Sequence, residues 1–214
     1  MGRTDLPRGL YAVTDSQLIP AGELTHRVAQ AIAGGAVVIQ YREKHQSRAA
    51  RQREATALQA LCRERGVPLI INDDIELAAA VGAAGVHLGR EDASVDQARA
   101  RLGPRALIGV SCYNRFERAC AAAAAGASYV AFGRFFPSAT KPGAVQAQPR
   151  LLEQARAHLD LPVVAIGGIT PENAAGLVMA GADLLAVIHG VFGQPDVEAA
   201  ARRYAALFDA PGEG

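Results

Sequence analysis

Short, mostly apolar segments alternate along this chain with longer, alanine-rich segments of helical periodicity. The short segments are rich in valine and isoleucine, and their apolar residues are consecutive rather than alternating. Strands that are buried on both faces have this pattern, which is typical of a parallel sheet covered by helices. The eight segments that we predict to be strands are Gly9–Val13, Ala36–Gln40, Pro68–Ile71, Gly85–Leu88, Ala106–Val110, Tyr129–Phe132, Pro162–Ile166 and Leu184–Ile188.

The intervening segments carry the start and stop signals of helices. The segment from Ser47 to Arg65 begins at a favourable N-cap residue and is followed by Gly66. The segment Pro171–Ala180 has proline in its first turn and Gly181 directly after its end. These signals predict helices that alternate with the strands.

Eight consecutive strand–helix units without a linker or a composition shift predict a closed (β/α)8 TIM barrel of the α/β class. We expect a single domain over residues 1–214, with a short N-terminal lead at 1–8 and a frayed tail at 209–214. The alternative is an open, doubly wound sheet. No Gly-x-Gly-x-x-Gly motif follows the first strand, which argues against a dinucleotide-binding version of that sheet.

Composition excludes several classes of partner. The 22 Lys and Arg residues nearly balance the 21 Asp and Glu residues, and tryptophan is absent, so no nucleic-acid partner is expected. No apolar run is long enough to cross a membrane, and the N-terminus lacks the pattern of a signal peptide. Three cysteines without a metal-binding spacing indicate reduced thiols and a cytoplasmic protein. The partners that remain are small molecules, and the oligomeric state stays open.

Polar residues follow nearly every predicted strand, at the end where barrels carry their chemistry. Gln40, Arg42 and Lys44 alternate with a period of two, so a persisting strand would point all three into the barrel mouth. Two cations and an amide at one place suit a polyanion such as a diphosphate. The alternative is that Arg42 and Lys44 are solvated loop charges.

Asp73 and Asp92 follow two neighbouring strands. Carboxylates at adjacent strand ends can share Mg²⁺, which binds one or two carboxylates together with substrate phosphates. Asp73 or Asp74 could instead cap the next helix, and Asp92 could cap its own, although Ser94 is better placed for that role.

Two further segments suggest anion binding. Gly167-Gly168 joins a strand to a helix N-terminus, where loops of barrels often hold phosphate, although a simple tight turn would look the same. Lys141 lies in a loop of small and polar residues, which could be a lid that carries a cation over the site or could leave Lys141 solvated. His87 could be a ligand or a core imidazole, and Cys112 lacks a partner base for nucleophilic catalysis.

A set of motifs spanning Gly9 to about Phe192 closely resembles the thiamine-phosphate synthase family. The set is specific although each motif alone is weak, and in chain order it reads QYREK, INDD, GVHLGREDAS, IGVSC, FGRFFPSATKPG, VVAIGGITPENA and GADLLAVIHGVF. The resemblance implies a (β/α)8 barrel that joins hydroxymethylpyrimidine diphosphate to thiazole phosphate. The implied products are thiamine phosphate and diphosphate, with Mg²⁺ as cofactor.

The resemblance also implies roles for individual residues. Arg42, Lys44 and Lys141 would be catalytic, and Asp73 and Asp92 would hold the metal. The pyrimidine diphosphate would bind to Gln40, Tyr41, Arg42, Glu43, Lys44, Asn72, Ser111 and Lys141. The thiazole phosphate would bind to Ser138, Ala139, Thr140, Gly168, Ile188 and His189.

Three positions depart from the family pattern. Ser138 replaces threonine, Arg134 replaces proline, and His189 replaces a common serine at the thiazole-phosphate end. Three alternative functions compete with this one: a thiazole tautomerase-like paralogue, a non-catalytic phosphometabolite-binding barrel, and another phosphate-binding barrel enzyme such as one from tryptophan synthesis. The complete set of diphosphate and metal residues disfavours all three.

Overall fold

The computed structural model describes residues 6–90, 92–137 and 146–209. Strands and helices alternate along the described chain, as the sequence predicts. The strands are β1 (Gly9–Val13), β2 (Ala36–Tyr41), β3 (Leu69–Asn72), β4 (Gly85–Leu88), β5 (Leu107–Tyr113), β6 (Tyr129–Gly133), β7 (Val163–Ile166) and β8 (Leu184–Val187). The helices are α1 (Leu24–Ala33), α2 (Arg48–Arg65), α3 (Ile75–Val81), α4 (Val95–Leu102), α5 (Phe116–Ala124), α6 (Arg150–His158), α7 (Pro171–Met179), α8 (His189–Phe192) and α9 (Val197–Ala205).

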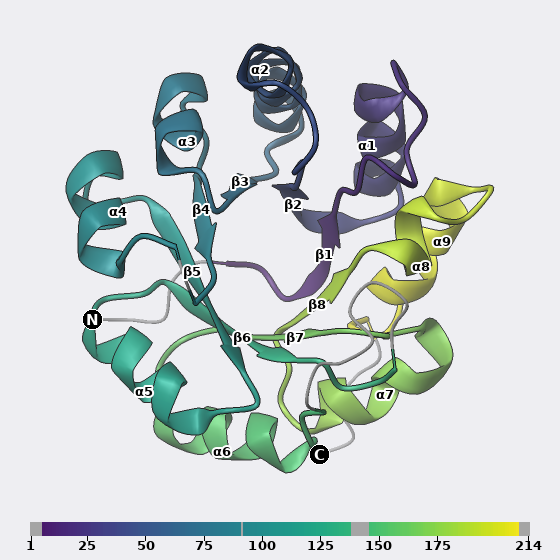
Figure 1. Cartoon of the computed structure of the whole chain (residues 1–214). Helices are drawn as coiled ribbons and strands as arrows, with labels where there is room; N and C mark the ends of the chain where they lie inside the picture. The colour runs from purple at the N-terminus through teal and green to yellow at the C-terminus, as the bar shows by residue number, and fades with distance from the viewer. Residues whose placement is uncertain (1–5, 91, 138–145, 210–214) are drawn as a thin grey trace.

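The eight strands form a closed parallel barrel in sequence order. β1 pairs with β2 on one side and with β8 on the other, so the sheet has no free edge. Figure 1 shows the strands at the centre and the helices in a ring around them. This confirms the predicted (β/α)8 barrel and excludes the open sheet. Most of the predicted lead and tail lies outside the described residues, so those boundaries stay predictions.

Alternate residues of each strand face opposite sides of the barrel wall. In β1, Tyr11 and Val13 belong to the cluster that fills the barrel interior, whereas Leu10 and Ala12 pack with the surrounding helices. All four side chains are buried, which explains why the strand is apolar at consecutive positions.

Four strands end later than the sequence indicates, and β3 and β6 do so by one residue each, at Asn72 and Gly133. β2 continues to Tyr41, and β5 continues past Ser111 to Tyr113 through a shift in its register with β6. Tyr113 takes a positive φ of 56° at this irregularity. Short runs of polar residues hide such extensions from sequence reasoning, because the backbone pairing with the next strand continues whatever the side chains are.

Helix signals in the sequence mark α2 and α7 to within one residue, since α7 ends at Met179 rather than at Ala180. The Ser47 side chain accepts a hydrogen bond from the Ala50 N–H, and Gly66 ends α2 in the left-handed conformation. Pro171 stands in the first turn of α7. Within the described residues, no helix is long and apolar enough to cross a membrane.

Arg99 on α4 ties together the loops that enter β5 and β6. Its Nη1 donates to the carbonyls of Gly103, Pro104 and Ala106 at 3.2, 3.0 and 2.6 Å. Its Nη2 donates to the Gly126 carbonyl at 3.0 Å. The guanidinium group therefore satisfies four carbonyls where the chain enters the barrel from the amino-terminal side.

Replacing Arg99 by methionine is expected to lower the free energy of unfolding by about 2–4 kcal/mol, because these carbonyls lose a charged donor. Urea unfolding measures the change. Arg101→Met is the matched control on the same helix: Arg101 makes an exposed ion pair with Glu76 at 2.9 Å, and its loss should change stability by less than about 1 kcal/mol. Equal losses in the two variants would contradict the role of Arg99.

Candidate active site

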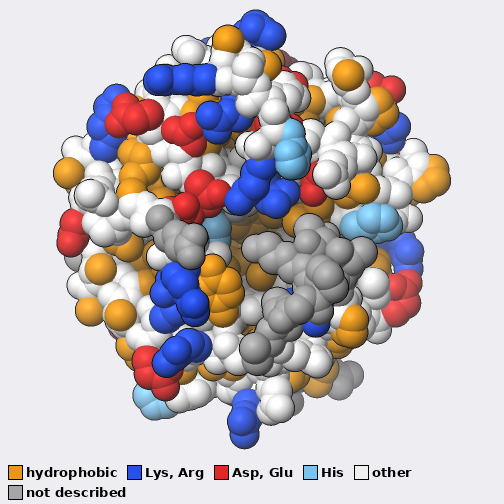
Figure 2. All heavy atoms as spheres, viewed as in Figure 1, with side chains coloured by type: hydrophobic (Ala, Val, Ile, Leu, Met, Phe, Trp, Pro, Cys, Tyr) orange, Lys and Arg blue, Asp and Glu red, His pale blue; other side chains and the backbone are white. Residues whose placement is uncertain are grey.

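A cavity of about 250 Å³ lies at the carboxyl ends of the barrel strands. Charged and histidine side chains gather around a hollow at the centre of the molecule, as Figure 2 shows. Every strand contributes to the cavity wall, as expected for the mouth of a (β/α)8 barrel. Its lining includes the predicted site residues Gln40, Arg42, Asn72, Ser111, Gly168, Ile188 and His189.

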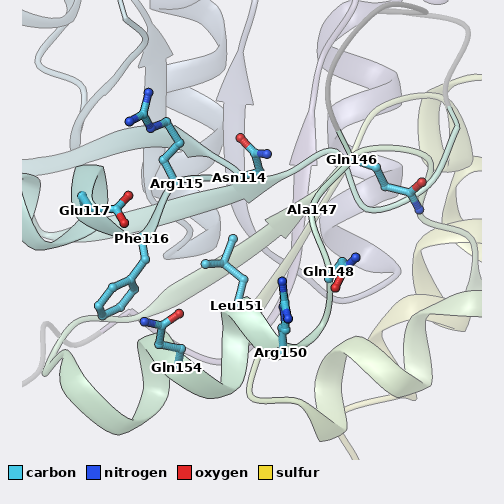
Figure 3. A pocket seen from close by; sticks show the side chains of 10 residues that line it. All are labelled: Asn114, Arg115, Phe116, Glu117, Gln146, Ala147, Gln148, Arg150, Leu151 and Gln154. Atoms are coloured by element: carbon cyan, nitrogen blue, oxygen red, sulfur yellow. The ribbon is translucent and has the colours of Figure 1, made fainter.

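A larger hollow of about 630 Å³ lies outside the barrel, between the start of α5 and helix α6 (Figure 3). Its wall includes Arg115, Glu117 and Arg150, and none of the residues predicted for the site. The mouth cavity is therefore the candidate active site, because residues from all eight strands line it and several of them are predicted site residues.

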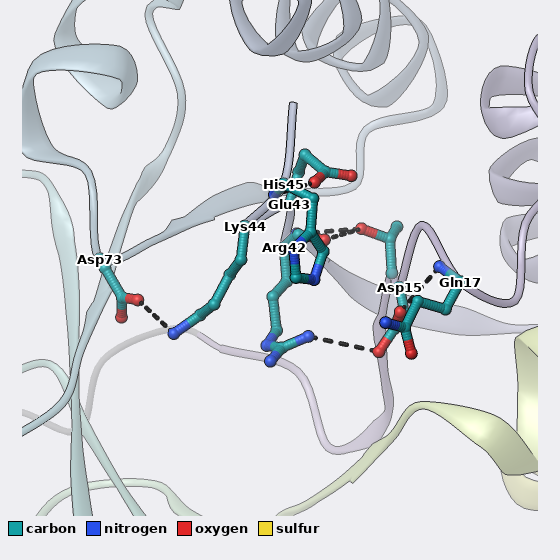
Figure 4. Close-up of polar contacts among 8 residues, drawn as sticks. Asp15, Gln17, Arg42, Glu43, Lys44, His45 and Asp73 are labelled. Carbon is teal, nitrogen blue, oxygen red and sulfur yellow. Dashed lines mark hydrogen bonds and ion pairs between the residues drawn. The ribbon is translucent and has the colours of Figure 1, made fainter. Parts of the chain in front are cut away.

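Arg42 and Lys44 reach over the mouth from the loop that follows β2, and each contacts a carboxylate (Figure 4). The Arg42 Nη1 lies 3.3 Å from Asp15 Oδ2, and the Lys44 Nζ lies 3.3 Å from Asp73 Oδ2. Arg42 is mostly buried and lines the cavity, whereas Lys44 is half exposed and is not among the lining residues. The two cations thus lie at the mouth as predicted, although β2 itself ends before them.

Two side chains shape the loop that carries these cations. The Thr14 hydroxyl accepts from the Arg42 N–H at 2.9 Å, which joins the ends of β1 and β2. The Glu43 carboxylate accepts from the backbone N–H groups of His45 and Gln46 at 2.5 and 3.1 Å. Glu43 therefore folds back on its own loop instead of pointing into the cavity.

Tyr41 points away from the mouth. Its hydroxyl donates to Glu54 Oε2 on α2 at 2.7 Å, and its ring packs between the barrel and the helices. The structure therefore does not bring the Tyr41 side chain together with Gln40 and Arg42. Successive residues of a strand face opposite sides, so these neighbours of Tyr41 point inward while Tyr41 points outward.

Asp73 and Asp92 lie side by side. Burial raises the pKa of Asp73, and so does the adjacent Asp92 carboxylate, while Lys44 opposes the shift. Asp92 is fixed by the Gly89 N–H, which donates to its Oδ2 at 2.5 Å. Two neighbouring carboxylates repel each other unless a cation or a proton lies between them.

The helix caps at these carboxylates are assigned by their hydrogen bonds. Asp74 caps α3, with its Oδ1 accepting from the Leu77 N–H at 2.9 Å, and Ser94 caps α4 with a capping box. Neither Asp73 nor Asp92 is the N-cap residue of a helix. No group of three or more histidine, cysteine or acidic residues suited to a metal ion occurs among the described residues. A pair of carboxylates fits a hard cation that completes its shell with substrate oxygens and water.

The opposite side of the mouth is built from the loop after β7. Gly168 has a φ of +66°, and a Cβ there would lie 2.4 Å from the Pro137 carbonyl oxygen. Asn173 Nδ2 in the first turn of α7 donates to the Gly168 carbonyl at 3.0 Å. The Tyr204 hydroxyl on α9 donates to the Ile169 carbonyl at 3.0 Å. These hydrogen bonds fix the backbone of the loop at the edge of the cavity, where the exposed His189 also lies.

A continuous chain of polar side chains crosses the barrel beneath the cavity, and sequence reasoning missed most of it. The contacts are Gln40 Nε2 to the Tyr11 hydroxyl at 2.8 Å and the Tyr11 to the Tyr129 hydroxyl at 2.8 Å. His87 then contacts the Tyr129 hydroxyl through Nδ1 at 3.2 Å and Ser111 Oγ through Nε2 at 2.9 Å. His87 is therefore a hydrogen-bonded core imidazole that also lines the cavity.

Four of the predicted site residues belong to a part of the chain that is not described. Ser138, Ala139, Thr140 and Lys141 lie outside the described residues. Cys112 is fully buried, and burial raises the pKa of its thiol to about 12, so it does not supply a thiolate nucleophile at neutral pH.

The stability of this protein is expected to depend on pH through His87. Burial lowers its pKa from 6.5 to about 4, so between these values the unfolded chain binds a proton that the folded protein does not. The free energy of unfolding should therefore fall as pH is lowered through this range, by up to roughly 3 kcal/mol. Urea unfolding at pH 7 and pH 4.5 measures the loss. The variant His87→Gln lacks this proton and should lose less stability; an equal loss in both proteins would rule out His87 as the source.

The fold and the cavity define the class of protein: a (β/α)8-barrel enzyme that acts on small molecules at the carboxyl ends of its strands. The family model described as thiamine monophosphate synthase matches residues 10–191. The chain belongs to this family, and it is a transferase of thiamine biosynthesis.

Two relatives and two solved structures are similar to the chain over most of its length. It is 55% identical to the thiamine-phosphate synthase of Nitrosococcus oceani over 92% of this chain and 91% of that protein. It is 52% identical to that of Aromatoleum aromaticum over 95% of this chain and 97% of that protein. The thiamine phosphate pyrophosphorylase of Pyrococcus furiosus superposes with a TM-score of 0.85 at 33% identity, over 97% of both chains. A 3-hexulose-6-phosphate synthase, at 18% identity, a TM-score of 0.67 and coverage of 93% of this chain and 99% of that chain, shares the fold alone.

Proposed function

We propose that this protein joins 4-amino-2-methyl-5-hydroxymethylpyrimidine diphosphate to 4-methyl-5-(2-phosphoethyl)thiazole, or to its carboxylate form. The products are thiamine phosphate and diphosphate. The observation that carries this proposal is the group of charges at the barrel mouth, where Arg42 lines the cavity and Lys44 lies 3.3 Å from Asp73 of the Asp73–Asp92 pair. Cations and a potential metal site at one place suit a diphosphate leaving group. The three free cysteines suit a cytoplasmic enzyme.

The pyrimidine diphosphate is assigned to the side of the mouth formed by β2 to β5. Arg42 and Lys44 bind the diphosphate oxygens, and Gln40, Asn72 and Ser111 line the adjacent cavity wall. Within this assignment the ion pairs of Arg42 with Asp15 and of Lys44 with Asp73 hold both cations in place before the substrate arrives. Lys141, assigned to the same substrate by resemblance, is outside the described residues.

We assign the magnesium site to Asp73 and Asp92. The fit rests on the adjacency of the two carboxylates: burial raises the pKa of Asp73, and the neighbouring Asp92 carboxylate raises it further. When bound there, Mg²⁺ would neutralise the charge that develops on the departing diphosphate. Lys44 and Arg42 add their own charges to the same oxygens, and Asp92 keeps its orientation through the Gly89 N–H.

The thiazole phosphate is assigned to the other side of the mouth. Gly168, Ile188 and His189 line the cavity there, next to the N-terminus of α7. A helix N-terminus beside bare glycine backbone suits a phosphate group. Ser138, Ala139 and Thr140 belong to the same assignment by resemblance.

The proposed reaction needs positioning and charge more than acid–base catalysis. The bond between the methylene carbon and the diphosphate oxygen breaks, and the oxygen leaves with the electron pair. The lone pair of the thiazole nitrogen then forms the new carbon–nitrogen bond. The residues of this chain hold the two substrates in line and neutralise the leaving group.

Incubation with both substrates and Mg²⁺ tests the proposal. The expected products are thiamine phosphate and one equivalent of diphosphate, and omission of either substrate should abolish both. Isomerisation of the thiazole phosphate without condensation would instead indicate a tautomerase. Binding of both substrates without turnover would indicate a non-catalytic barrel.

A further inference from the structure

Five hydrogen-bonded side chains form a relay that joins opposite walls of the barrel: Gln40 on β2, Tyr11 on β1, Tyr129 on β6, His87 on β4 and Ser111 on β5. The two end residues, Gln40 and Ser111, line the mouth cavity and are assigned to the pyrimidine substrate. The proposed reaction gives no part to the three residues between them. Tyr11 and Tyr129 are 2% and 0% exposed, so both residues are buried in the barrel.

The rings of the relay also hold one another in place. Tyr11 and Tyr129 meet edge to face with centroids 6.0 Å apart, and His87 stacks on Tyr129 with centroids 5.7 Å apart. Side chains in a close-packed interior occupy defined rotamers. The hydroxyl and imidazole groups therefore meet in one fixed geometry.

The protons of this relay can be placed from its first contact. Gln40 donates through Nε2, so the Tyr11 oxygen accepts there and its own proton goes to Tyr129. The proton of Tyr129 then goes to His87 Nδ1. In this arrangement the hydroxyl protons of Tyr11 and Tyr129 each have an acceptor among the observed contacts. We prefer it because a buried donor without an acceptor costs free energy.

The tautomer of His87 follows from the same argument. Its Nδ1 accepts from Tyr129, so the single proton of the neutral ring is on Nε2 and is donated to Ser111 Oγ. Ser111 already accepts that bond, which leaves its own proton to donate into the cavity. At the other end, Gln40 has used an N–H group on Tyr11, which leaves its amide oxygen to accept from a ligand.

We propose that Tyr11, Tyr129 and His87 are positioning residues that fix the polarity of the two side chains at the relay ends. Ser111 is held as a donor toward an acceptor of the ligand, and Gln40 as an acceptor toward an N–H group of the ligand. An aminopyrimidine that carries a diphosphate offers both groups in one molecule; this identification of the ligand rests on the proposed function, whereas the polarity of the relay does not.

Nitrogen-15 NMR of the histidine rings in the full-length, ligand-free protein tests the polarity directly. The spectrum of His87→Gln assigns the signal of His87 among the five histidines of the chain. The expected result at neutral pH is a protonated Nε2 and an unprotonated Nδ1. A proton on Nδ1, alone or together with Nε2, would overturn the proposal, whether or not the protein makes thiamine phosphate.

Binding of the pyrimidine diphosphate in the presence of Mg²⁺ tests the coupling between the relay and the site. Tyr129→Phe removes one hydroxyl at nearly constant volume and should weaken binding about tenfold, the effect of one net hydrogen bond. The double variant Tyr129→Phe/Ser111→Ala should bind no more than about twofold more weakly than Ser111→Ala alone, because both changes break one chain.

Tyr204→Phe is the matched control, since Tyr204 is also fully buried but donates to Ile169 outside the relay. Its effect on binding should multiply with that of Ser111→Ala. If the effects of Tyr129→Phe and Ser111→Ala on binding also multiplied in the double variant, the coupling would be overturned. A wild-type protein that does not bind the pyrimidine diphosphate would refute the ligand assignment, and the NMR result would still decide the polarity.

Discussion

Replacing Asp92 by asparagine is expected to lower turnover by at least about a hundredfold while the protein stays folded. The amide keeps the shape of the carboxylate and can still accept from the Gly89 N–H. It removes one of the two negative charges that we assign to the metal site. Loss of a strong electrostatic contact to the leaving group typically lowers turnover by about a hundredfold or more. Steady-state rates at saturating Mg²⁺ and substrates measure it.

The stability of the same variant separates function from folding. Burial raises the pKa of Asp73 and the adjacent Asp92 carboxylate raises it further, so neutralising Asp92 should leave the free energy of unfolding unchanged or slightly higher. Asp74→Ala is the control: it removes the N-cap of α3, which should cost about 1 kcal/mol of stability and leave turnover within about twofold. Full turnover in Asp92→Asn at limiting Mg²⁺ would remove Asp92 from the metal site.

Replacing Gly168 by alanine is expected to damage the thiazole-phosphate side of the mouth. The new Cβ would lie 2.4 Å from the Pro137 carbonyl and 2.7 Å from the Phe136 carbonyl, so the loops after β6 and β7 must move apart. Left-handed backbone adds about 1–2 kcal/mol for a residue with a side chain. We expect KM for the thiazole phosphate to rise at least about tenfold, with a much smaller change for the pyrimidine diphosphate.

Gly66→Ala isolates the effect of the close approach. Gly66 has nearly the same φ, +68° against +66° for Gly168, but a Cβ there meets nothing within 4 Å. Both variants share the backbone strain, so only Gly168→Ala should alter the kinetics. A matching KM in the two variants would show that the contact with the loop after β6 does not shape the site.

The polar ends of the strands are the most useful functional signal in the sequence. They predict Gln40, Arg42 and Asn72 as site residues, and all three line the cavity. The local signal fails at Tyr41, which stands between two of the site residues but faces α2. Tyr41 is still part of β2, so the alternation of strand side chains turns it to the side opposite Gln40.

The proposed metal ligands likewise needed the structure to separate them from helix caps. The acidic residues Asp73, Asp74 and Asp92 could each be a helix cap or a ligand from sequence alone. The structure gives the cap of α3 to Asp74 and places Asp73 beside Asp92. Which of two successive carboxylates turns toward the helix depends on the backbone angles at the strand end, where Asp73 has a φ of +64°.

The sequence by itself determined the barrel, because its consecutive apolar residues recur in every unit and its helix-ending glycines in most units. It also located the mouth, because parallel strands all end at the same side. Only the tertiary structure decided which side chains meet. Tyr11 and Tyr129 are separated by 118 positions, and their hydroxyl groups come within 2.8 Å only because the sheet closes on itself. Contacts across a closed barrel depend on its register, which no short stretch of sequence encodes.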